Sequence, residues 1–394
     1  MAKVLLHTPE GVRDVYGKEC AKKLALENNI NEVFGLYGYH NIQTPTFEFF
    51  DIFSKERGSV PSKDLYKFFD REGNTLVLRP DVTPSIARSV AKYYMDDVVP
   101  IKLCYNANTY INNSELQGKL KENTHMGCEL IGDDSIDADA EIIAMIVDTL
   151  KKSGLKEFLV EIGEVDFFKG LLEECGFSEE TEEELRLLIE NKNFFGVEEL
   201  LENLGVSKEL GQGFIKLPEL FGQNEVLDVA KKLTNNEKAL MAINRLEKLY
   251  EILEDYGVTK YISFDLGMLS DFNYYTGIIF KAYTYGTGDA IVTGGRYDKL
   301  LGQYGKDAAA IGFAVYVDRL LFALNGQKVN ISDNYIFEVI VYEEEKRSEA
   351  LNMALELRNK GIKTELILKS DNINIDEYVN FKKLDGAVKV TYLK

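Results

Sequence analysis

Ser270–Gly277, with the sequence SDFNYYTG, and Ala290–Asp298, AIVTGGRYD, which follows closely, are the most informative segments of this chain. Short runs of β-branched and aromatic residues flank the first segment at 261–266 and 278–283, and runs of this kind predict strands. Each segment alone fits an ordinary hairpin of an antiparallel sheet. The two together are more specific, and they indicate a sheet with a cleft beside it.

The side chains of these segments suggest how the cleft is lined. Because side chains alternate along a strand, we expect Tyr274 and Tyr275 on opposite faces, one in the core and one with its hydroxyl at the cleft. Gly294 and Gly295 allow backbones to approach closely, which would place the Arg296 guanidinium beside the opening.

The composition is that of a globular protein of two or three domains. The chain has 394 residues, of which 45% are hydrophobic and 28% charged. It contains no apolar run of the ~20 residues that a membrane span needs, and its first residues lack the apolar core of a signal peptide. The cysteines are far apart and form no CxxC pair, so we expect the reduced thiols of a cytoplasmic protein, with no disulfide framework, metal site or cofactor. They are Cys20, Cys104, Cys128 and Cys175.

The charge balance argues against nucleic acid as a partner. Lys and Arg number 46 against 65 Asp and Glu, a formal net charge of −19. Phosphate backbones are bound by clustered cations, and the sequence offers only one short, modestly basic stretch, Lys119–Lys121.

The first part of the chain reads as a helix followed by short strands. Apolar residues at helical spacing predict a helix over 17–37. A strand is expected at 39–48, and Pro45 within it fits the edge of a sheet. Two further strands, 65–69 and 75–78, flank a turn-rich loop.

The second of these strands leads through Arg79 into the start of a helix. Thr83-Pro84 has the form of an N-cap followed by proline at the first helical position. Asp81, near that N-terminus, meets a favourable helix dipole and is placed to bind an ammonium group at the mouth of the sheet. A strand at 101–105 follows the helix.

A returning strand carries the next candidate residues. A polar loop at 112–124 precedes an expected strand at 125–132. His125, Gly127 and Glu129 share one face of this strand because the side-chain period is two. They can form the floor of a binding pocket, although a solvent-facing polar side fits the same residues.

The second half of the core alternates helices with strands. A helix is expected at 137–150 and a strand at 158–162, and residues 164–258 read as a mostly helical insertion with a solvated acidic face. A strand that runs into a helix over 308–321 places Arg319 at the junction, where it can reach the cleft.

Two domains are expected, a core at 1–325 and a small C-terminal α/β module at 333–394. The module reads as a strand, a helix and two further strands, whereas Asp371–Lys382 shows no obvious packed helix. Within the core, a short helix is expected at 297–301.

Several motifs occur in the order in which one known family has them. They are Thr8–Asp14 (TPEGVRD), Thr44–Glu48 (TPTFE), Leu78–Asp81 (LRPD), Tyr274-Tyr275, Gly294–Asp298 (GGRYD) and Gly312–Arg319 (GFAVYVDR). With these motifs, residues 8–325 resemble the catalytic core of class II histidyl-tRNA synthetases. The resemblance implies an α+β fold with a mixed, mostly antiparallel sheet flanked by helices, a helical insertion and a homodimer.

The departures from that family concern amino-acid activation. Ile111 stands where the synthetases have an arginine that holds the ATP α-phosphate, and Ser270–Asn273 stands where they have Arg-Gly-Leu-Asp. Preorganised cations at a developing charge typically contribute several kcal/mol, so the loss of both argues against adenylate formation. Two further changes are His125 in place of a glutamine and Asp81 in place of a glutamate.

A second family keeps the synthetase core without these features. The run Leu78–Arg88, LRPDVTPSIAR, with its aspartate and second proline, is more similar to the regulatory subunit of short-form ATP phosphoribosyltransferase. That resemblance implies a non-catalytic subunit of a hetero-oligomer. Such a subunit binds the catalytic subunit, raises its activity and transmits feedback inhibition by histidine in histidine biosynthesis.

The same resemblance implies a histidine-binding pocket. An ammonium group needs hydrogen-bond acceptors, which carboxylates and hydroxyls supply. The expected residues are Asp81 and Thr83 near the α-amino group, Glu129 and His125 on the floor, and Tyr274 or Tyr275 against the imidazole.

Two alternatives stay open at the level of the sequence. A divergent histidyl-tRNA synthetase or histidine-activating enzyme could hold a nucleotide with Arg79, Arg296 and Arg319. An interaction scaffold with a vestigial pocket would bind its partner regardless of histidine.

Overall fold

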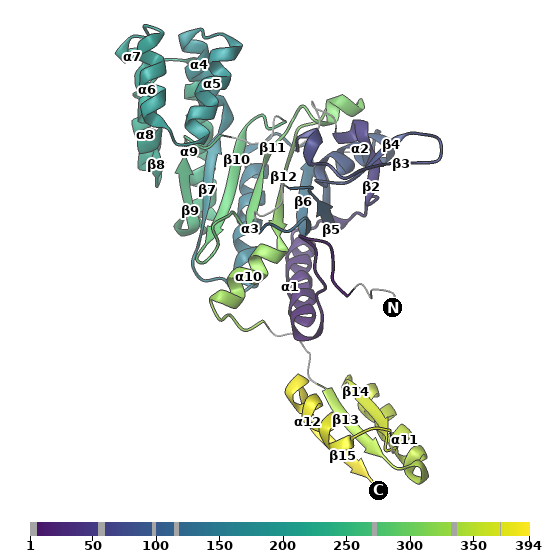
Figure 1. Cartoon of the computed structure of the whole chain (residues 1–394). Helices are drawn as coiled ribbons and strands as arrows, with labels where there is room; N and C mark the ends of the chain where they lie inside the picture. The colour runs from purple at the N-terminus through teal and green to yellow at the C-terminus, as the bar shows by residue number, and fades with distance from the viewer. Residues whose placement is uncertain are drawn as a thin grey trace. The chain divides into compact units, whose positions relative to one another are not determined.

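The structure is a computed structural model (Figure 1). It describes residues 6–53, 60–96, 100–113, 118–269, 274–331, 337–370 and 372–394. Among these residues, no helix combines the length and the apolar character needed to cross a bilayer.

Contacts divide the chain into two compact units. One contains residues 26–330 and the N-terminal segment up to Arg13, and the other contains 331–394 together with Asp14–Ala25. The two domains that we propose from the sequence differ from these units mainly because they assign Asp14–Ala25 to the core and not to the C-terminal module.

A sheet of nine strands, counted within the described residues, forms the centre of the first unit. Its order is β1-β5-β6-β12-β11-β10-β7-β9-β8, and all neighbours are antiparallel except β1 with β5 and β7 with β9. The predicted mixed, mostly antiparallel sheet is therefore confirmed. The strands are β1 (His40–Asn41), β5 (Ile101–Tyr110), β6 (Glu122–Ile131), β7 (Phe158–Glu164), β8 (Phe221–Gly222), β9 (Ile262–Asp265), β10 (Ile278–Thr284), β11 (Val292–Arg296) and β12 (Ala310–Tyr316).

Helices pack on both faces of this sheet. On one face, Ile86 of α2 joins Leu103 and Tyr105 of β5 in a buried cluster. On the other face, the ring of Phe34 in α1 lies edge-on to Phe313 of β12, with ring centroids 5.7 Å apart. The helices of the core are α1 (Gly17–Leu36), α2 (Thr83–Tyr93), α3 (Ile136–Lys152) and α10 (Val317–Gly326).

Helix α2 begins where the sequence predicts a helix, but Thr83 is not its N-cap. The helix starts at Thr83 itself, with Val82 at the N-cap position and Pro84 in the first turn. The Asp81 carboxylate accepts the backbone N–H groups of Val82 and Thr83, at the N-cap and first helical positions, which would otherwise lack an intrahelical partner. The Thr83 hydroxyl is used elsewhere, as a donor to Glu129.

The helical insertion lies between β7 and β9, as the fold prediction requires. Five of its helices follow polar residues whose side chains accept a backbone N–H, namely Glu164, Ser178, Asn193, Ser207 and Asn236. The longest of these helices, α9, packs against α3 and β7. The insertion consists of α4 (Val165–Cys175), α5 (Glu179–Glu190), α6 (Phe194–Asn203), α7 (Lys208–Lys216), α8 (Glu225–Ala230) and α9 (Glu237–Asp255).

The strands around the predicted polar loop are longer than expected. Strand β5 continues to Tyr110 and β6 begins at Glu122, so the prediction of a strand ending at 105 and a loop lasting to 124 is wrong at both ends. Backbone pairing continues to Tyr110 and Glu122, and the Asn108 side chain donates to Glu122 across the pair at 2.8 Å. Polar side chains that pair with one another let these strands extend without burying apolar surface.

Two other local predictions are corrected. The expected strand at 39–48 is broken at Pro45 into β1 and β2, and the expected helix at 297–301 is a 3₁₀ turn at Leu301–Tyr304. The second part of the broken strand joins a small antiparallel sheet of order β2-β4-β3. This sheet consists of β2 (Phe47–Phe49), β3 (Lys67–Phe69) and β4 (Thr75–Leu78).

The C-terminal module is a three-stranded parallel sheet of order β14-β13-β15 with two helices. The prediction that Asp371–Lys382 lacks a packed helix is wrong. Asn374 caps α12 by accepting the N–H of Glu377, and Val379 packs against Phe337 in the core of the module. The elements are β13 (Phe337–Tyr342), α11 (Arg347–Asn359), β14 (Thr364–Leu368), α12 (Ile375–Asp385) and β15 (Ala387–Leu393).

Candidate ligand-binding site

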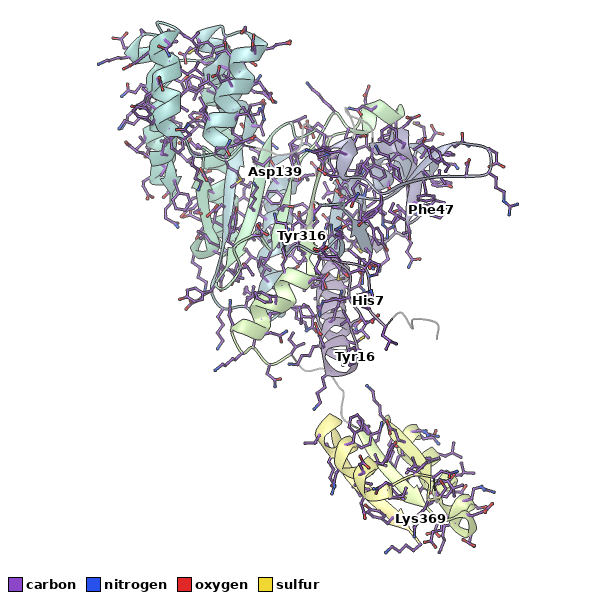
Figure 2. All side chains as sticks on the ribbon, viewed as in Figure 1. His7, Tyr16, Phe47, Asp139, Tyr316 and Lys369 are labelled. Atoms are coloured by element: carbon purple, nitrogen blue, oxygen red, sulfur yellow. The ribbon has the colours of Figure 1, made fainter. Side chains whose placement is uncertain are left out.

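A cavity of about 240 Å³ opens beside β6 and β12, next to the start of α2. Sites for drug-sized ligands usually measure roughly 300–1,000 Å³, so this cavity suits a molecule as small as one amino acid. Tyr316, labelled in Figure 2, lies in its wall at the end of β12. All six residues of the predicted histidine pocket line it: Asp81, Thr83, His125, Glu129, Tyr274 and Tyr275.

Glu129 is the most deeply buried acid of the cavity, with 1% of its surface exposed. The Thr83 hydroxyl donates to its Oε1 at 2.7 Å, and the Tyr297 hydroxyl donates to its Oε2. Burial raises the pKa of Glu129 to about 8, helped by the negative charge of Asp81 and opposed by the two hydroxyl donors. The free carboxyl is therefore mostly protonated at neutral pH, and a bound cation would favour its ionised form.

The space around Glu129 depends on a glycine in the neighbouring strand. A Cβ atom added to Gly312 would lie 1.8 Å from Glu129 Oε2 and 2.6 Å from the Cys128 carbonyl oxygen. The glycine of the GFA motif thus leaves the room that the carboxyl occupies.

His125 lies two side-chain repeats away from Glu129 on the same face of β6, as the alternation of the strand predicts. Its Nε2 is 3.2 Å from the Thr109 hydroxyl, and its ring lies edge-on to Tyr316 at 4.6 Å between centroids. Burial, with the nearby charges of Arg319 and Arg79 adding to it, lowers the pKa of His125 to about 3. At neutral pH the imidazole is neutral and offers one donor and one acceptor.

The two adjacent tyrosines both line the cavity, which contradicts the expectation that they face opposite ways. They belong to the turn before β10, which begins at Ile278, so the alternation of a strand does not apply to them. Their ring centroids are 4.9 Å apart, and the Tyr274 hydroxyl donates to Asp81 Oδ2 at 3.2 Å. Asp81 is thereby held between the start of α2 and the tyrosine turn.

Of the three arginines expected near the pocket, Arg319 lines the cavity and the other two do not. The Arg319 guanidinium lies over the Tyr316 ring at 4.2 Å from its centroid and donates to the Ala290 carbonyl at 2.8 Å. It is the only arginine among the described residues of the cavity wall, which also includes Ile111.

Arg79 and Arg296 are held inside the protein by other groups. Arg79 donates to the backbone carbonyls of Thr44, Pro45 and Asn108, where it fixes the chain before α2. The buried Arg296 pairs with the carboxylate of Asp139 on α3, and also with Asp298.

Tyr297 is the functional residue that sequence reasoning missed. It belongs to the GGRYD motif and donates to Glu129. Side chains alternate along a strand, so Gly295 and Tyr297, which are two residues apart, are expected on the same face. This alternation is the signal that could have placed Tyr297 at the cavity. Within the described part of the chain, no group of His, Cys, Asp and Glu has the number of ligands that a metal ion needs.

The chain matches known proteins over almost its full length. The family model described as Histidyl-tRNA synthetase matches residues 11–320. The ATP phosphoribosyltransferase regulatory subunit of Acetivibrio thermocellus is 41% identical over 391 residues, which cover 99% of this chain and 94% of that protein.

Solved structures agree with this match. A structure of an ATP phosphoribosyltransferase regulatory subunit/histidyl-tRNA synthetase from Bacillus halodurans C superposes with a TM-score of 0.90 at 33% identity, with 99% of both chains covered. The histidyl-tRNA synthetase of Nostoc sp. PCC 7120 has a TM-score of 0.80 at 21% identity, covering 97% of this chain and 90% of that one, and so shares the fold. The chain therefore belongs to the family of ATP phosphoribosyltransferase regulatory subunits, which is built on the fold of the histidyl-tRNA synthetases.

Proposed function

We propose that this chain binds free histidine in the cavity at β6 and uses it to regulate a short-form ATP phosphoribosyltransferase catalytic subunit. The observation that carries the proposal is the combination of two acids, Asp81 and Glu129, with the neutral imidazole of His125 in one small cavity. The relatives named as regulatory subunits support the choice of partner. The subunit would activate the catalytic partner and make it sensitive to histidine, in the cytoplasm, without touching nucleic acid or membrane.

The arrangement of the cavity suits the two ends of a histidine molecule. The α-ammonium group would lie at the carboxylates of Asp81 and Glu129, and the ligand imidazole would pack against Tyr274 and Tyr275. Neutral His125 adds a hydrogen-bonding partner without a repelling charge. The chain itself would not form an adenylate, because phosphoryl chemistry requires preorganised cations and the described cavity wall offers a single arginine, Arg319.

Histidine affinity is expected to rise with pH up to about 8. With the pKa of Glu129 raised to about 8, the free carboxyl must release a proton before it can pair with an ammonium group. The apparent Kd should fall by about fivefold between pH 7 and 8, because the ionised fraction of a carboxyl with a pKa of about 8 rises by that factor. Calorimetry at these two pH values checks this, and the ligand imidazole, which titrates near pH 6.5, changes little in this window.

One variant makes the pH experiment specific. The Glu129→Gln variant should lose the dependence on pH, because its amide does not titrate. A Kd for the unchanged chain that is constant or rises from pH 7 to 8 would contradict the role of the Glu129 carboxylate.

We also propose a homodimer, which an exposed aromatic face supports. On the small sheet, Phe47 and Phe49 of β2 are 52% and 55% exposed, and Phe68 of β3 packs edge-on against Phe47 with centroids 5.7 Å apart. By strand alternation these three side chains share one face. An apolar face of this kind on a soluble protein marks an interaction surface.

Charges placed on that face should separate the dimer. The double variant Phe47→Glu/Phe49→Glu is expected to be monomeric at micromolar concentration, because pairing would bury unpaired carboxylates. Sedimentation equilibrium gives the molar mass directly. Phe69→Glu, on the opposite face of β3, is the matched control and should stay dimeric. A dimer in both variants would show that the interface lies elsewhere.

A further inference from the structure

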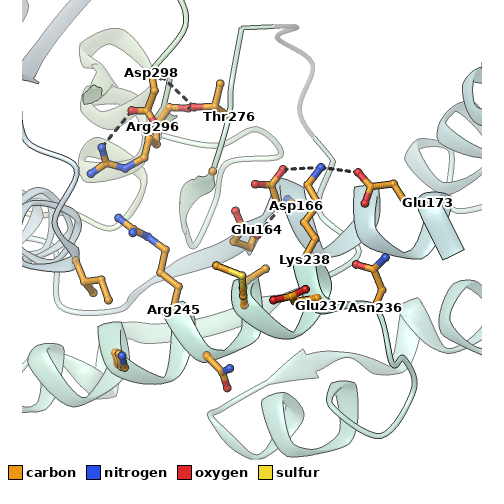
Figure 3. Close-up of a pocket in the computed structure, with 16 residues that line it drawn as sticks. Glu164, Asp166, Glu173, Asn236, Glu237, Lys238, Arg245, Thr276, Arg296 and Asp298 are labelled. Carbon is orange, nitrogen blue, oxygen red and sulfur yellow. Dashed lines mark hydrogen bonds and ion pairs between the residues drawn. The ribbon is translucent and has the colours of Figure 1, made fainter. Parts of the chain in front are cut away.

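A second, larger cleft lies between the helical insertion and the core. Its volume is about 760 Å³, within the range of roughly 300–1,000 Å³ that is usual for small-molecule sites. One wall is the face of α9 that carries Lys238, Met241 and Arg245, and the other includes Glu164 at the end of β7 (Figure 3). None of the residues of the proposed histidine pocket lines it.

Three of the four cations that line this cleft are paired with carboxylates, and the fourth, Lys248, is exposed and has no salt bridge among the described residues. Lys238 reaches across to Glu173 at 2.8 Å and to Asp166 at 3.9 Å, as the dashed lines in Figure 3 show. Arg245 and Arg296 both pair with Asp139, which lies outside the cleft wall. An anionic ligand would have to break these pairs or rely on the exposed Lys248 alone, so the inner part of the cleft does not favour one.

Glu164 stands in this wall without a cation. Only 3% of its surface is exposed, and no lysine or arginine among the described residues forms a salt bridge with it. Its Oε2 accepts the N–H of Asp166 at 3.0 Å, as the N-cap of α4. Leaving a buried carboxyl without a cation is costly unless a partner arrives from outside.

The groups around Glu164 explain its protonation. Burial, followed by the negative charge of Asp166, raises the pKa of Glu164 to about 8, and the N–H groups of Asp166 and Phe167 with the charge of Lys169 oppose the rise. At neutral pH the free carboxyl is mostly protonated. A cation beside it would restore ionisation and release the proton.

The remaining lining of the cleft indicates the chemistry of that cation. Met241 is 65% exposed and offers an apolar surface to a carbon chain, and Glu237 on the same helix is a second acid without a salt bridge in the described part of the chain. A metal ion is not favoured, because the described residues contain no group of three ligands for one. The structure thus places an acid in each wall of the cleft, and Met241 lies one helical turn from Glu237 on α9.

We propose that this cleft binds a small linear organic amine, with one ammonium group paired to Glu164, a second near Glu237 and the carbon chain along Met241. The site goes beyond the regulatory function and does not depend on it.

Calorimetry with putrescine, the four-carbon diamine, tests the site on the full-length chain. We expect saturable binding that weakens with added salt and no binding of 1,4-butanediol, which has the same length without charge. At pH 7, titrations in two buffers of different ionisation enthalpy should show the release of close to one proton per putrescine bound, since Glu164 ionises.

Two variants locate the site. Glu164→Gln keeps an acceptor for the N-cap and should weaken binding by about tenfold or more and abolish proton release. Glu161→Gln, on the same strand but outside the cleft wall, is the matched control and should bind as the unchanged chain does. If Glu164→Gln does not fold, as judged by circular dichroism, the exposed Glu237→Gln gives the same test and should weaken binding at least threefold. No saturable heat at millimolar putrescine, or equal affinity in the Glu164 and Glu161 variants, would overturn the proposal.

Discussion

Histidine binding should weaken by about 2–5 kcal/mol, or roughly 30-fold or more in Kd, when Glu129 is replaced by glutamine. The charge of a buried carboxylate is the strongest partner that the cavity offers to an ammonium group. Glutamine has nearly the same shape and can still accept from Thr83 and pair with Tyr297, so the fold of the cavity should persist. Isothermal calorimetry at pH 8, where the carboxylate of the unchanged chain is ionised in large part, measures the difference.

A matched substitution on the same strand controls for nonspecific effects. Glu122→Gln lies at the start of β6, outside the cavity, and pairs with Asn108 and Tyr110. We expect this variant to bind histidine with unchanged affinity. If Glu129→Gln bound histidine within threefold of the unchanged chain, the assignment of the ammonium group to this carboxylate would be wrong.

Asp139→Ala should destabilise the chain by about 3–5 kcal/mol. Asp139 is fully buried on α3 and is shared by Arg296 of β11 and Arg245 of α9, so it joins the core to the helical insertion. Its removal leaves the buried guanidinium of Arg296 with Asp298 as its single remaining carboxylate partner among the described residues. Urea unfolding followed by circular dichroism gives the change in free energy.

The control for this prediction is on the same helix. Asp137 is exposed in the first turn of α3 and contributes mainly through the helix dipole, so Asp137→Ala should cost no more than about 1 kcal/mol. Equal losses for the two variants would mean that the shared pairing adds nothing, and that the insertion is held by its apolar contacts alone.

The parts of the site that sequence reasoning found are those that follow from local periodicity or from motifs. His125 and Glu129 share a strand face because they are four residues apart, and the structure places both in the cavity. Asp81 and Thr83 belong to a strand-to-helix junction that the sequence marks with prolines. The resemblance to known families then supplied the reason to join these segments to the tyrosine pair, which lies almost two hundred residues further along the chain.

The predictions that failed concern residues whose conformation or partners depend on contacts with distant parts of the sequence. Tyr274 and Tyr275 were treated as strand residues, but the turn before β10 directs both into the cavity. Arg79 and Arg296 looked like cleft residues by their position in motifs, yet their side chains point to backbone carbonyls and to Asp139. Nothing in the local sequence of either arginine reveals those partners.

Helix α12 and the larger cleft were missed for related reasons. The segment that forms α12 has a weak apolar stripe, and only the packing of the buried Val379 on the module's sheet shows that the helix is packed. The larger cleft combines β7 with α9, whose residues are far apart in the sequence, and Glu164 reads simply as the end of a strand. Its burial without a cation is visible only in three dimensions.

The most direct test of the regulatory role is the rate of phosphoribosyl-ATP formation by a short-form catalytic subunit from the same source, with and without this chain, across a histidine titration. We predict that the chain raises the rate, that histidine reverses the increase, and that Glu129→Gln still activates but resists histidine. A rate that does not change with the chain at any ratio, or histidine-dependent ATP–pyrophosphate exchange by the chain alone, would contradict the regulatory role and favour the synthetase-like alternative.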